Sequence, residues 1–329
     1  MSNQKILVTG GTGFIGSALV KGLVRSGYKV RVFDNNFRGS NDRLKDVLSS
    51  IEIIEGDIRQ KEDVLGAVKG CEVVFHLAFI NGTKYFYEQP KLVLDVGVKG
   101  ALNTLEAAME CGVRQYILAS SSEVYQQPTH VPTTETERLM IPDPLNPRYS
   151  YGGGKLISEL LTLNYLRDSG IRHSIFRPHN IFGPQMGFEH VIPEIMRKLY
   201  EATDRWNQNS CELQIQGTGE EGRAFCYVGD AVDQVITITE KGLSGQIYHI
   251  GMDEEITIQQ LVQDIAEALG IKVNIKPGEL RQGGTSRRCP SIEKVKSLGY
   301  QKKNHYREGL GKTVAWYKQY FLEQQTVNK

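Results

Sequence analysis

The sequence predicts an α/β fold, a doubly wound parallel sheet with a smaller C-terminal lobe interleaved with it. Three observations favour this class. Short apolar runs alternate along the first half of the chain with segments in which apolar residues recur at helical spacing. The first apolar run ends in a glycine-rich turn between Gly10 and Gly16. The chain has 329 residues, more than one small hydrophobic core requires.

The N-terminal half supplies most of the expected sheet. Each expected strand is a short apolar run, typical of a parallel strand buried on both faces: 5–10, 29–34, 51–57, 72–78 and 115–121. Helices are expected between them, at 14–27, 61–70 and 90–112. Strands and helices in this alternation build a parallel sheet with right-handed crossovers.

The C-terminal half continues this alternation and then leaves it. The proline-rich segment 128–148 is an irregular excursion, because a helix at 150–170 and a strand at 172–178 resume the pattern. After Pro178 we expect loops, short strands and a helix near 191–202. Segment 223–242 is predicted to be a strand and a helix that rejoin the main sheet. A strand at 246–251 and helices at 257–270 and 306–324 follow. The expected division is 1–177 plus 224–250 for the sheet domain, and 178–223 plus 251–329 for the smaller lobe.

Composition and charge exclude several classes of protein. The formal net charge is +1, so no overall field favours nucleic acid or an anionic membrane. No apolar run is long enough to span a bilayer, and no apolar signal segment precedes the first glycines. The five cysteines are scattered, and no group of potential ligands has metal-site spacing. We therefore expect a cytoplasmic protein with free thiols that binds no metal, nucleic acid or membrane.

The glycine-rich turn predicts a Rossmann-type dinucleotide site. Gly10, Gly13 and Gly16 permit a tight turn and a close approach of the backbone to a pyrophosphate at a helix N-terminus. Asp34 follows at about the ~20-residue offset at which a carboxylate binds a ribose 2′-hydroxyl and repels a 2′-phosphate. This favours NAD over NADP, although Arg38 nearby could accept a phosphate. The alternative is a structural turn with Asp34 as a solvated acid.

A tyrosine and a lysine four residues apart, Tyr151 and Lys155, share one face at the start of an expected helix. Free tyrosine has a pKa near ~10, and a neighbouring ammonium favours the phenolate. The tyrosine can then take a hydroxyl proton while a hydride leaves the same carbon. The pair follows the strand end "SSSEVY" (120–125), and open α/β sheets bind ligands at the carboxyl ends of their strands.

Together these residues resemble the extended short-chain dehydrogenase/reductase family, and within it the nucleotide-sugar epimerases, dehydratases and decarboxylases. The resemblance covers nearly the whole chain. It includes the runs "GDIR" (56–59), "HLA" (76–78), "RPHNIFGP" (177–184), "GRAFCYVGD" (222–230) and "RRCPSIEKVKSLGY" (287–300). The resemblance implies NAD as cofactor, a nucleotide-diphosphate sugar as substrate, and a nucleotide-sugar-binding role for the smaller lobe. It also implies a homodimer in which helices 91–111 and 151–169 pair across a two-fold axis.

The resemblance also assigns the candidate site residues. The catalytic set is Ser121, Ser122, Glu123, Tyr151 and Lys155. The expected cofactor contacts are Gly10, Thr12, Gly13, Phe14, Ile15, Gly16, Asp34, Asn35, Asp57, Ile58, Leu77, Ala78, Tyr151 and Lys155. The expected substrate contacts are Asn180, Arg223 and Arg288, the arginines being suited to the diphosphate, or Arg288 to a sugar carboxylate. The chain departs from the family at Gln126, usually glycine, and at Gly97, usually an asparagine that supports the lysine.

Glu123 indicates chemistry beyond inversion at C4. In the family that this chain resembles, Ser121 would hydrogen-bond the hydroxyl that Tyr151 deprotonates, and a 4-keto sugar forms. A Ser-Glu pair before "VY", with an arginine placed like Arg288, resembles the nucleotide-glucuronate decarboxylases. We expect oxidation at C4 followed by decarboxylation, epimerisation or dehydration at C5. The alternatives are a plain 4-epimerase with Glu123 solvated or in a structural ion pair, a 4-dehydrogenase releasing the keto sugar, and a non-catalytic NAD-binding module.

Overall fold

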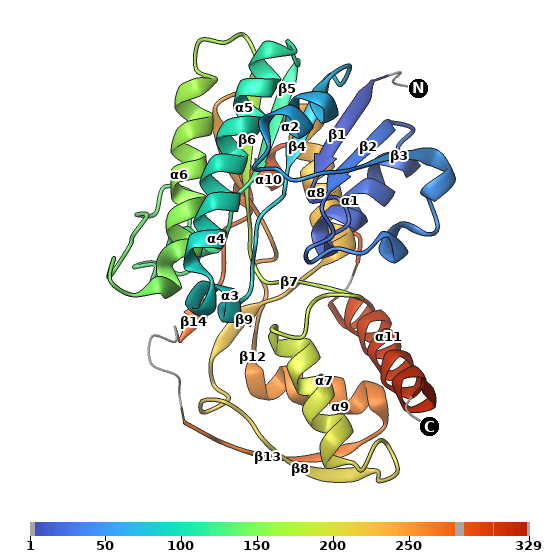
Figure 1. Cartoon of the computed structure of the whole chain (residues 1–329). Helices are drawn as coiled ribbons and strands as arrows, with labels where there is room; N and C mark the ends of the chain where they lie inside the picture. Colours follow the sequence, from blue (N-terminus) through green and yellow to red (C-terminus); the bar gives the residue numbers. More distant parts are fainter. Residues whose placement is uncertain (1–3, 280–285, 305, 328–329) are drawn as a thin grey trace.

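The computed structural model describes residues 4–279, 286–304 and 306–327. Figure 1 shows a layered body of strands and helices and, below it, a smaller group of elements. This group contains α7 (Val191–Ala202), α9 (Ile258–Leu269) and α11 (Tyr306–Val327). The larger body contains the predicted sheet.

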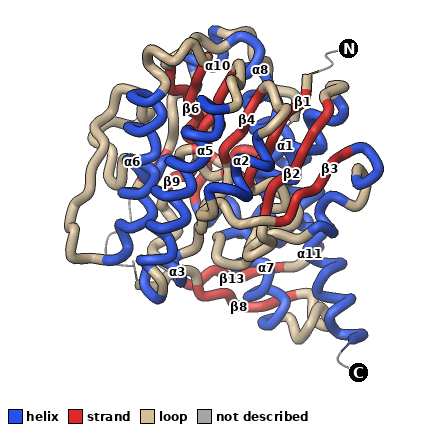
Figure 2. Tube along the Cα trace, turned by 45° about the horizontal axis from the view of Figure 1, so that its top comes forward, coloured by secondary structure: helices blue, strands red, loops and turns tan. Residues whose placement is uncertain are grey.

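Seven strands form the central sheet, in the order β11-β6-β5-β4-β1-β2-β3, and every neighbouring pair is parallel. Strands β1, β2 and β3 lie side by side in both views (Figures 1 and 2). The bounds are β1 (Lys5–Thr9), β2 (Lys29–Asp34), β3 (Ile51–Glu55), β4 (Val73–His76), β5 (Gln115–Ala119), β6 (Arg172–Pro178) and β11 (Gln246–Ile250). The predicted doubly wound parallel sheet is confirmed.

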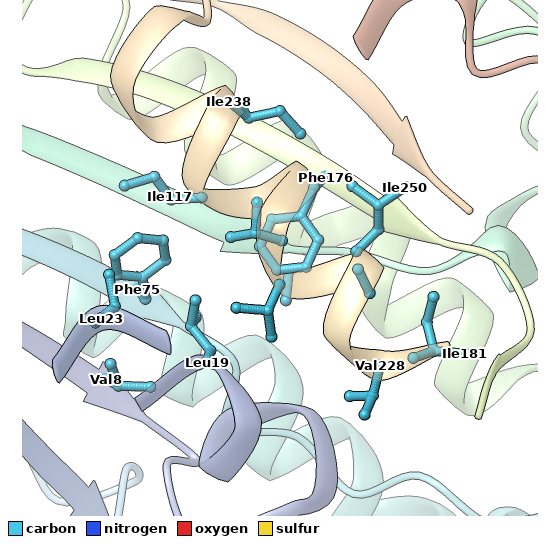
Figure 3. Packing of buried hydrophobic residues seen from close by; sticks show 14 of the residues in the cluster. Val8, Leu19, Leu23, Phe75, Ile117, Phe176, Ile181, Val228, Ile238 and Ile250 are labelled. Atoms are coloured by element: carbon cyan, nitrogen blue, oxygen red, sulfur yellow. The ribbon is translucent and has the colours of Figure 1, made fainter. Parts of the chain in front are cut away.

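Helices cover both faces of this sheet. On one face, α1 (Phe14–Arg25) and α8 (Val228–Lys241) pack on the strands. Figure 3 shows Leu19 and Ile238 of these helices beside Phe75 and Phe176 of the sheet. On the other face lie α2 (Lys61–Val68), α5 (Gly100–Glu110) and α6 (Ser150–Tyr165). Each helix buries an apolar stripe against the sheet, which is the main source of its stability.

A second hydrophobic core lies in the smaller group. Ile195 of α7, Leu261 of α9 and Tyr317 of α11 belong to one buried cluster. Strands β8 (Ser210–Gln214) and β13 (Lys272–Lys276) pair in parallel beside it. The remaining short strands are β7 (Ile181–Phe182), β9 (Gly222–Ala224), β10 (Cys226–Tyr227), β12 (Glu255–Thr257) and β14 (Arg287–Arg288), which form two further small sheets.

The segment 223–242 differs from its prediction. Helix α8 packs on the main sheet as expected, but β9 pairs with β12 and β14, and β10 pairs with β7. Neither strand rejoins the main sheet, because β11 already occupies the edge beside β6.

The helix expected at 90–112 has three parts. Helix α4 (Pro90–Leu94) begins with a proline, a π-helical turn follows at Asp95–Lys99, and α5 completes the run. Two short helices were not predicted, α3 (Thr83–Glu88) and α10 (Glu293–Ser297). The five cysteines are free thiols, as expected. Among the described residues, no helix has the length and apolar character needed to cross a membrane.

Candidate active site

A cavity of about 610 Å³ opens at the carboxyl ends of the central strands. Ligands of doubly wound sheets bind in this position. The cavity brings together most of the predicted site residues from all parts of the chain. They are Gly10, Gly13, Phe14, Ile15, Gly16, Asp34, Asn35, Ile58, Leu77, Ala78, Ser121, Ser122, Glu123, Tyr151, Lys155, Asn180 and Arg288.

The glycine-rich turn has the close packing that a dinucleotide site requires. Gly10 has a φ of 70°, and a Cβ there would lie 2.7 Å from the backbone nitrogen of Ala78. A Cβ on Gly16 would lie 2.1 Å from the carbonyl oxygen of Gly10. Helix α1 begins at Phe14, and its N-cap Gly13 provides no side-chain cap, so its first N–H groups can serve a phosphate. The turn therefore fits a pyrophosphate.

The acid at the end of β2 is fixed by the backbone. Asp34 Oδ2 accepts a hydrogen bond from Thr12 N at 3.0 Å, and Oδ1 accepts one from Asn36 N at 3.0 Å. Arg38, the residue that could have accepted a 2′-phosphate, instead pairs with Glu189 at 3.1 Å and lies over the Tyr85 ring at 5.1 Å. Its charge is thus already matched by a carboxylate.

Tyr151 and Lys155 are buried at the start of α6. Lys155 Nζ donates to the carbonyl oxygen of Ala119 at 2.6 Å and lies 4.2 Å from the centre of the Phe79 ring. Burial lowers the pKa of Lys155 to about 7. The Tyr151 ring stacks on Phe86 at 5.0 Å and meets the edge of Phe79 at 5.1 Å.

The expected lowering of the Tyr151 pKa by the Lys155 ammonium is not seen in the structure. Burial raises the pKa of Tyr151 to about 12, and a hydrogen bond with Ser121 lowers it only in part. The Lys155 nitrogen is 6.0 Å from the centre of the Tyr151 ring and turned to the Ala119 carbonyl. Burial, rather than the charge of Lys155, therefore sets the direction of the Tyr151 pKa.

The strand end "SSSEVY" places a carboxylate beside an arginine. Ser121 caps a short turn, its hydroxyl oxygen accepting from Glu123 N at 3.2 Å. Glu123 Oε1 accepts from Arg288 Nη1 at 2.6 Å. Burial tends to raise the pKa of Glu123, but Arg288 and Arg148 outweigh it and hold this pKa below its usual value. Glu123 is therefore ionised at neutral pH.

A buried ion pair between Arg177 and Glu159 anchors the strand end "SSSEVY" (120–125). Arg177 of β6 makes two hydrogen bonds to Glu159 of α6, Nε to Oε1 at 2.8 Å and Nη2 to Oε2 at 2.6 Å. The hydroxyl of Ser120 donates to the same carboxylate, and the Tyr125 hydroxyl accepts from Arg177. The two ends of the "SSSEVY" segment are thus tied to one pair.

A family model described as "NAD dependent epimerase/dehydratase family" matches residues 6–251. The chain belongs to this family. A relative from Bacillus cytotoxicus, named UDP-N-acetyl-alpha-D-glucosaminuronate decarboxylase, is 31% identical over 96% of this chain and 98% of its own length. The family membership confirms the predicted resemblance and NAD as the cofactor.

Two solved structures share the fold along almost the whole chain. The UDP-glucose 4-epimerase of Thermotoga maritima, with UDP-glucose, is 28% identical. Its TM-score is 0.84, with 96% of this chain and 99% of that chain covered. MoeE5, solved with UDP-glucuronic acid and NAD, is 27% identical. Its TM-score is 0.79, with the same coverage of 96% and 99%. The chain is therefore a member of the nucleotide-sugar branch that the sequence resembles.

Two departures from the family's usual residues have a structural reason. A Cβ at Gly97 would lie 2.2 Å from the Phe79 ring, which fills the space beside Lys155. In this epimerase/dehydratase-family chain the lysine is held by the Ala119 carbonyl. Gln126, at the usual glycine position, has a φ of 54°, and its Nε2 donates to the Glu123 carbonyl oxygen at 2.5 Å.

Three predicted residues do not line the cavity. Thr12 is fully buried and contributes its backbone N–H to Asp34. The carboxylate of Asp57 is held by the guanidinium of Arg59, at 3.0 Å between Arg59 Nε and Asp57 Oδ1. Arg223 Nη1 donates to the Gly222 carbonyl oxygen at 2.7 Å. A role for Arg223 in binding a diphosphate stays a prediction.

Sequence reasoning missed Arg148 and Phe79. Both line the cavity, Phe79 against the Tyr151 ring and Arg148 beside Glu123 and Arg288. The sequence did carry one signal for Arg148. A cation directly before a long helix is unfavourable beside the helix dipole, so its position called for another explanation.

Proposed function

We propose that the enzyme decarboxylates a nucleotide-diphosphate uronate after oxidising the sugar at C4. The observation that carries this proposal is the charge balance around Glu123. One carboxylate, Glu123, faces two guanidinium groups, those of Arg288 and Arg148, across the same end of the cavity. A site with one excess positive charge favours a sugar that carries a carboxylate. The uronate decarboxylase relative and the MoeE5 complex with UDP-glucuronic acid support the same substrate class.

The protein groups fit this reaction. NAD⁺, when bound, supplies the acceptor for the hydride that leaves C4. Tyr151 takes the proton of the C4 hydroxyl, and Ser121 holds that oxygen by a hydrogen bond, since the two side chains already share one. Because burial lowers the pKa of Lys155 to about 7, the lysine can exchange a proton with the tyrosine at neutral pH.

The C4 ketone makes the carboxylate a leaving group. When the bond between C5 and the carboxylate breaks, CO₂ leaves and the electron pair is delocalised onto the C4 oxygen. A proton then adds to C5, and return of the hydride to C4 restores the alcohol. Glu123 is ionised, so we propose that it orients the sugar through Arg288 or accepts a proton. Its low pKa makes it a poor proton donor.

A mass experiment tests the proposal. NAD-loaded enzyme is incubated with UDP-glucuronate, UDP-N-acetylglucosaminuronate or UDP-glucose. The masses of the products are measured by mass spectrometry, and their structures are assigned by NMR. A uronate product lighter by the mass of CO₂ is expected, and Tyr151→Phe should give none. Loss of water, or an unchanged mass with a new sugar configuration, would contradict decarboxylation.

A second candidate is 4-epimerisation, because the chain resembles the UDP-glucose 4-epimerase along its whole length. In that reaction Glu123 and Arg288 form only a structural pair. Inversion of UDP-glucose, with no release of CO₂ from either uronate, would favour it.

We also propose the assignment of the remaining parts. The smaller lobe, residues 178–223 plus 251–329, binds the nucleotide, with Asn180 at its edge of the cavity. The enzyme is a homodimer in which α5 and α6 pair with the same helices of a second copy.

A further inference from the structure

Arg148 has an unusual place beside the catalytic candidates. It lies in a short turn, Pro147–Tyr149, directly before α6, and its backbone N–H donates to Asn146 Oδ1 at 3.0 Å. The residue is half-buried and lines the cavity with Ser121, Glu123, Tyr151 and Arg288. The side chain thus belongs to the reacting end of the site.

Stability does not explain an arginine in this position. The N-terminus of a helix carries a partial positive charge, so a cation there is destabilising. Within residues 4–279, 286–304 and 306–327, no carboxylate lies within the 4.0 Å ion-pair distance of the Arg148 guanidinium. Arg288, by contrast, is bound to Glu123 at 2.6 Å. The positive charge that remains to be matched at this end of the cavity is therefore that of Arg148.

We propose that Arg148 binds the C5 carboxylate of the substrate and sets the preference for uronates over neutral hexoses. This inference rests on the proposed function. A planar guanidinium forms two parallel hydrogen bonds with a carboxylate, which fixes the orientation of the sugar as well as binding it. Arg288 keeps Glu123 as its partner, so no ion pair has to break when the substrate enters.

The position of Arg148 along the chain agrees with the chemistry. It precedes Tyr151 by three residues, and both line the same cavity. Tyr151 acts at C4, and the carboxylate is carried by C5, the next carbon of the ring. A carboxylate bound by Arg148 therefore lies beside the hydroxyl that the tyrosine deprotonates.

Calorimetry on NAD-loaded protein tests this assignment. All variants carry Tyr151→Phe, so that the ligand is not consumed, and each is titrated with UDP-glucuronate and with UDP-glucose. Arg148→Gln should weaken UDP-glucuronate binding by roughly 10- to 100-fold, the range for loss of a charged hydrogen-bonded pair, and leave UDP-glucose unchanged. Arg148→Lys should recover part of the lost affinity for UDP-glucuronate, because lysine keeps the positive charge but cannot form the two parallel hydrogen bonds of a guanidinium.

The matched control is Arg138→Gln, an exposed arginine of the same 128–148 excursion that does not line the cavity. It should leave both affinities unchanged. If the parent protein binds both ligands equally, the proposed function fails before Arg148 is tested. If the parent prefers UDP-glucuronate and Arg148→Gln keeps that preference, the Arg148 assignment is wrong and the proposed function stands.

Discussion

Glu123 and Arg288 are 165 residues apart in the sequence, yet their side chains meet at 2.6 Å in the cavity. From the sequence, Glu123 could either act on the sugar or form a structural ion pair, and this contact is compatible with both. Glu123 is in an ion pair with an arginine, as the structural interpretation requires, and it also faces the space where a sugar would lie. The ion pair keeps the carboxylate charged without removing it from the site.

Replacing Glu123 should separate two steps of the reaction. Glu123→Gln keeps the shape and removes the charge, while Ser121, Tyr151 and Lys155 remain in place to assist oxidation of C4 by NAD⁺. Transient NADH absorbance should therefore persist on addition of UDP-glucuronate. The later step at C5 should slow by roughly 10²- to 10⁴-fold if Glu123 moves a proton. Stopped-flow absorbance and product assays measure the two steps.

The control for this experiment is Tyr151→Phe, which should abolish the NADH signal itself. Normal turnover by Glu123→Gln would show that the carboxylate is only a structural partner of Arg288. Plain 4-epimerisation would then become the better interpretation.

Asp34 should determine the choice between the two dinucleotides. Its carboxylate is fixed by Thr12 N and Asn36 N at the end of β2, where it can meet a ribose hydroxyl but repels a phosphate. The enzyme should therefore bind NAD more tightly than NADP, and Asp34→Ala should reduce that ratio by about 10-fold or more, since a charged hydrogen bond contributes about 1.5–3 kcal/mol. Calorimetry with both dinucleotides measures it, and Asp46→Ala, an exposed acid, serves as control. An unchanged ratio in Asp34→Ala would remove the carboxylate from cofactor selection.

At the scale of elements, local pattern predicted the central sheet well and the short strands poorly. The runs at 5–10 and 172–178 each have an apolar centre, Ile6–Val8 and Ile175–Phe176, so the burial of these residues follows from their own composition. Strands β8 and β13 are separated by the 57 residues 215–271, and they pair in register from Ser210 with Lys272 to Gln214 with Lys276. Pairing of this kind depends on the tertiary fold. In the excursion 128–148, the only local sign of the place of Arg148 was a cation directly before a long helix, and its approach to the cavity likewise depends on the tertiary fold.

The turn between β1 and α1 tolerates no side chain at its third glycine. Gly16→Ala would place a Cβ 2.1 Å from the Gly10 carbonyl oxygen, a contact with a main-chain atom that no rotamer change relieves. We expect a loss of stability of about 1–3 kcal/mol and loss of bound NAD. Denaturant unfolding and the NAD content of purified protein measure the two effects.

Gly66 provides the matched control, because it is an exposed glycine inside α2 with no atom within 4 Å of an added Cβ. Gly66→Ala should stabilise the protein by about 0.5–1 kcal/mol and leave NAD bound. Equal behaviour of the two variants would mean that the close contact at Gly16 has no role in the cofactor site.

At the scale of the whole molecule, one helical face remains uncovered. Helices α4, α5 and α6 lie side by side at the edge of the sheet body (Figure 1). On α6, Ile157 is 39% exposed and Leu160 is 51% exposed, and Met109 of α5 is 44% exposed. Apolar side chains that recur at helical spacing on an outer face indicate a contact with another molecule. The same two helices are those that the family resemblance implies for a two-fold dimer.

The dimer proposal therefore gives a direct prediction. Wild-type enzyme should have twice the mass of the chain in light scattering, because a two-fold axis lets each copy bury this face against the other. Leu160→Glu places a charge on the proposed contact face of both copies, so it should yield monomers while the far-ultraviolet circular dichroism stays unchanged. The control is Leu48→Glu, at a residue 45% exposed before β3, at the opposite edge of the sheet. It should remain dimeric, because that edge has no part in the proposed interface. A wild-type monomer at every concentration, or a Leu160→Glu protein that stays dimeric, would show that α6 does not form the contact.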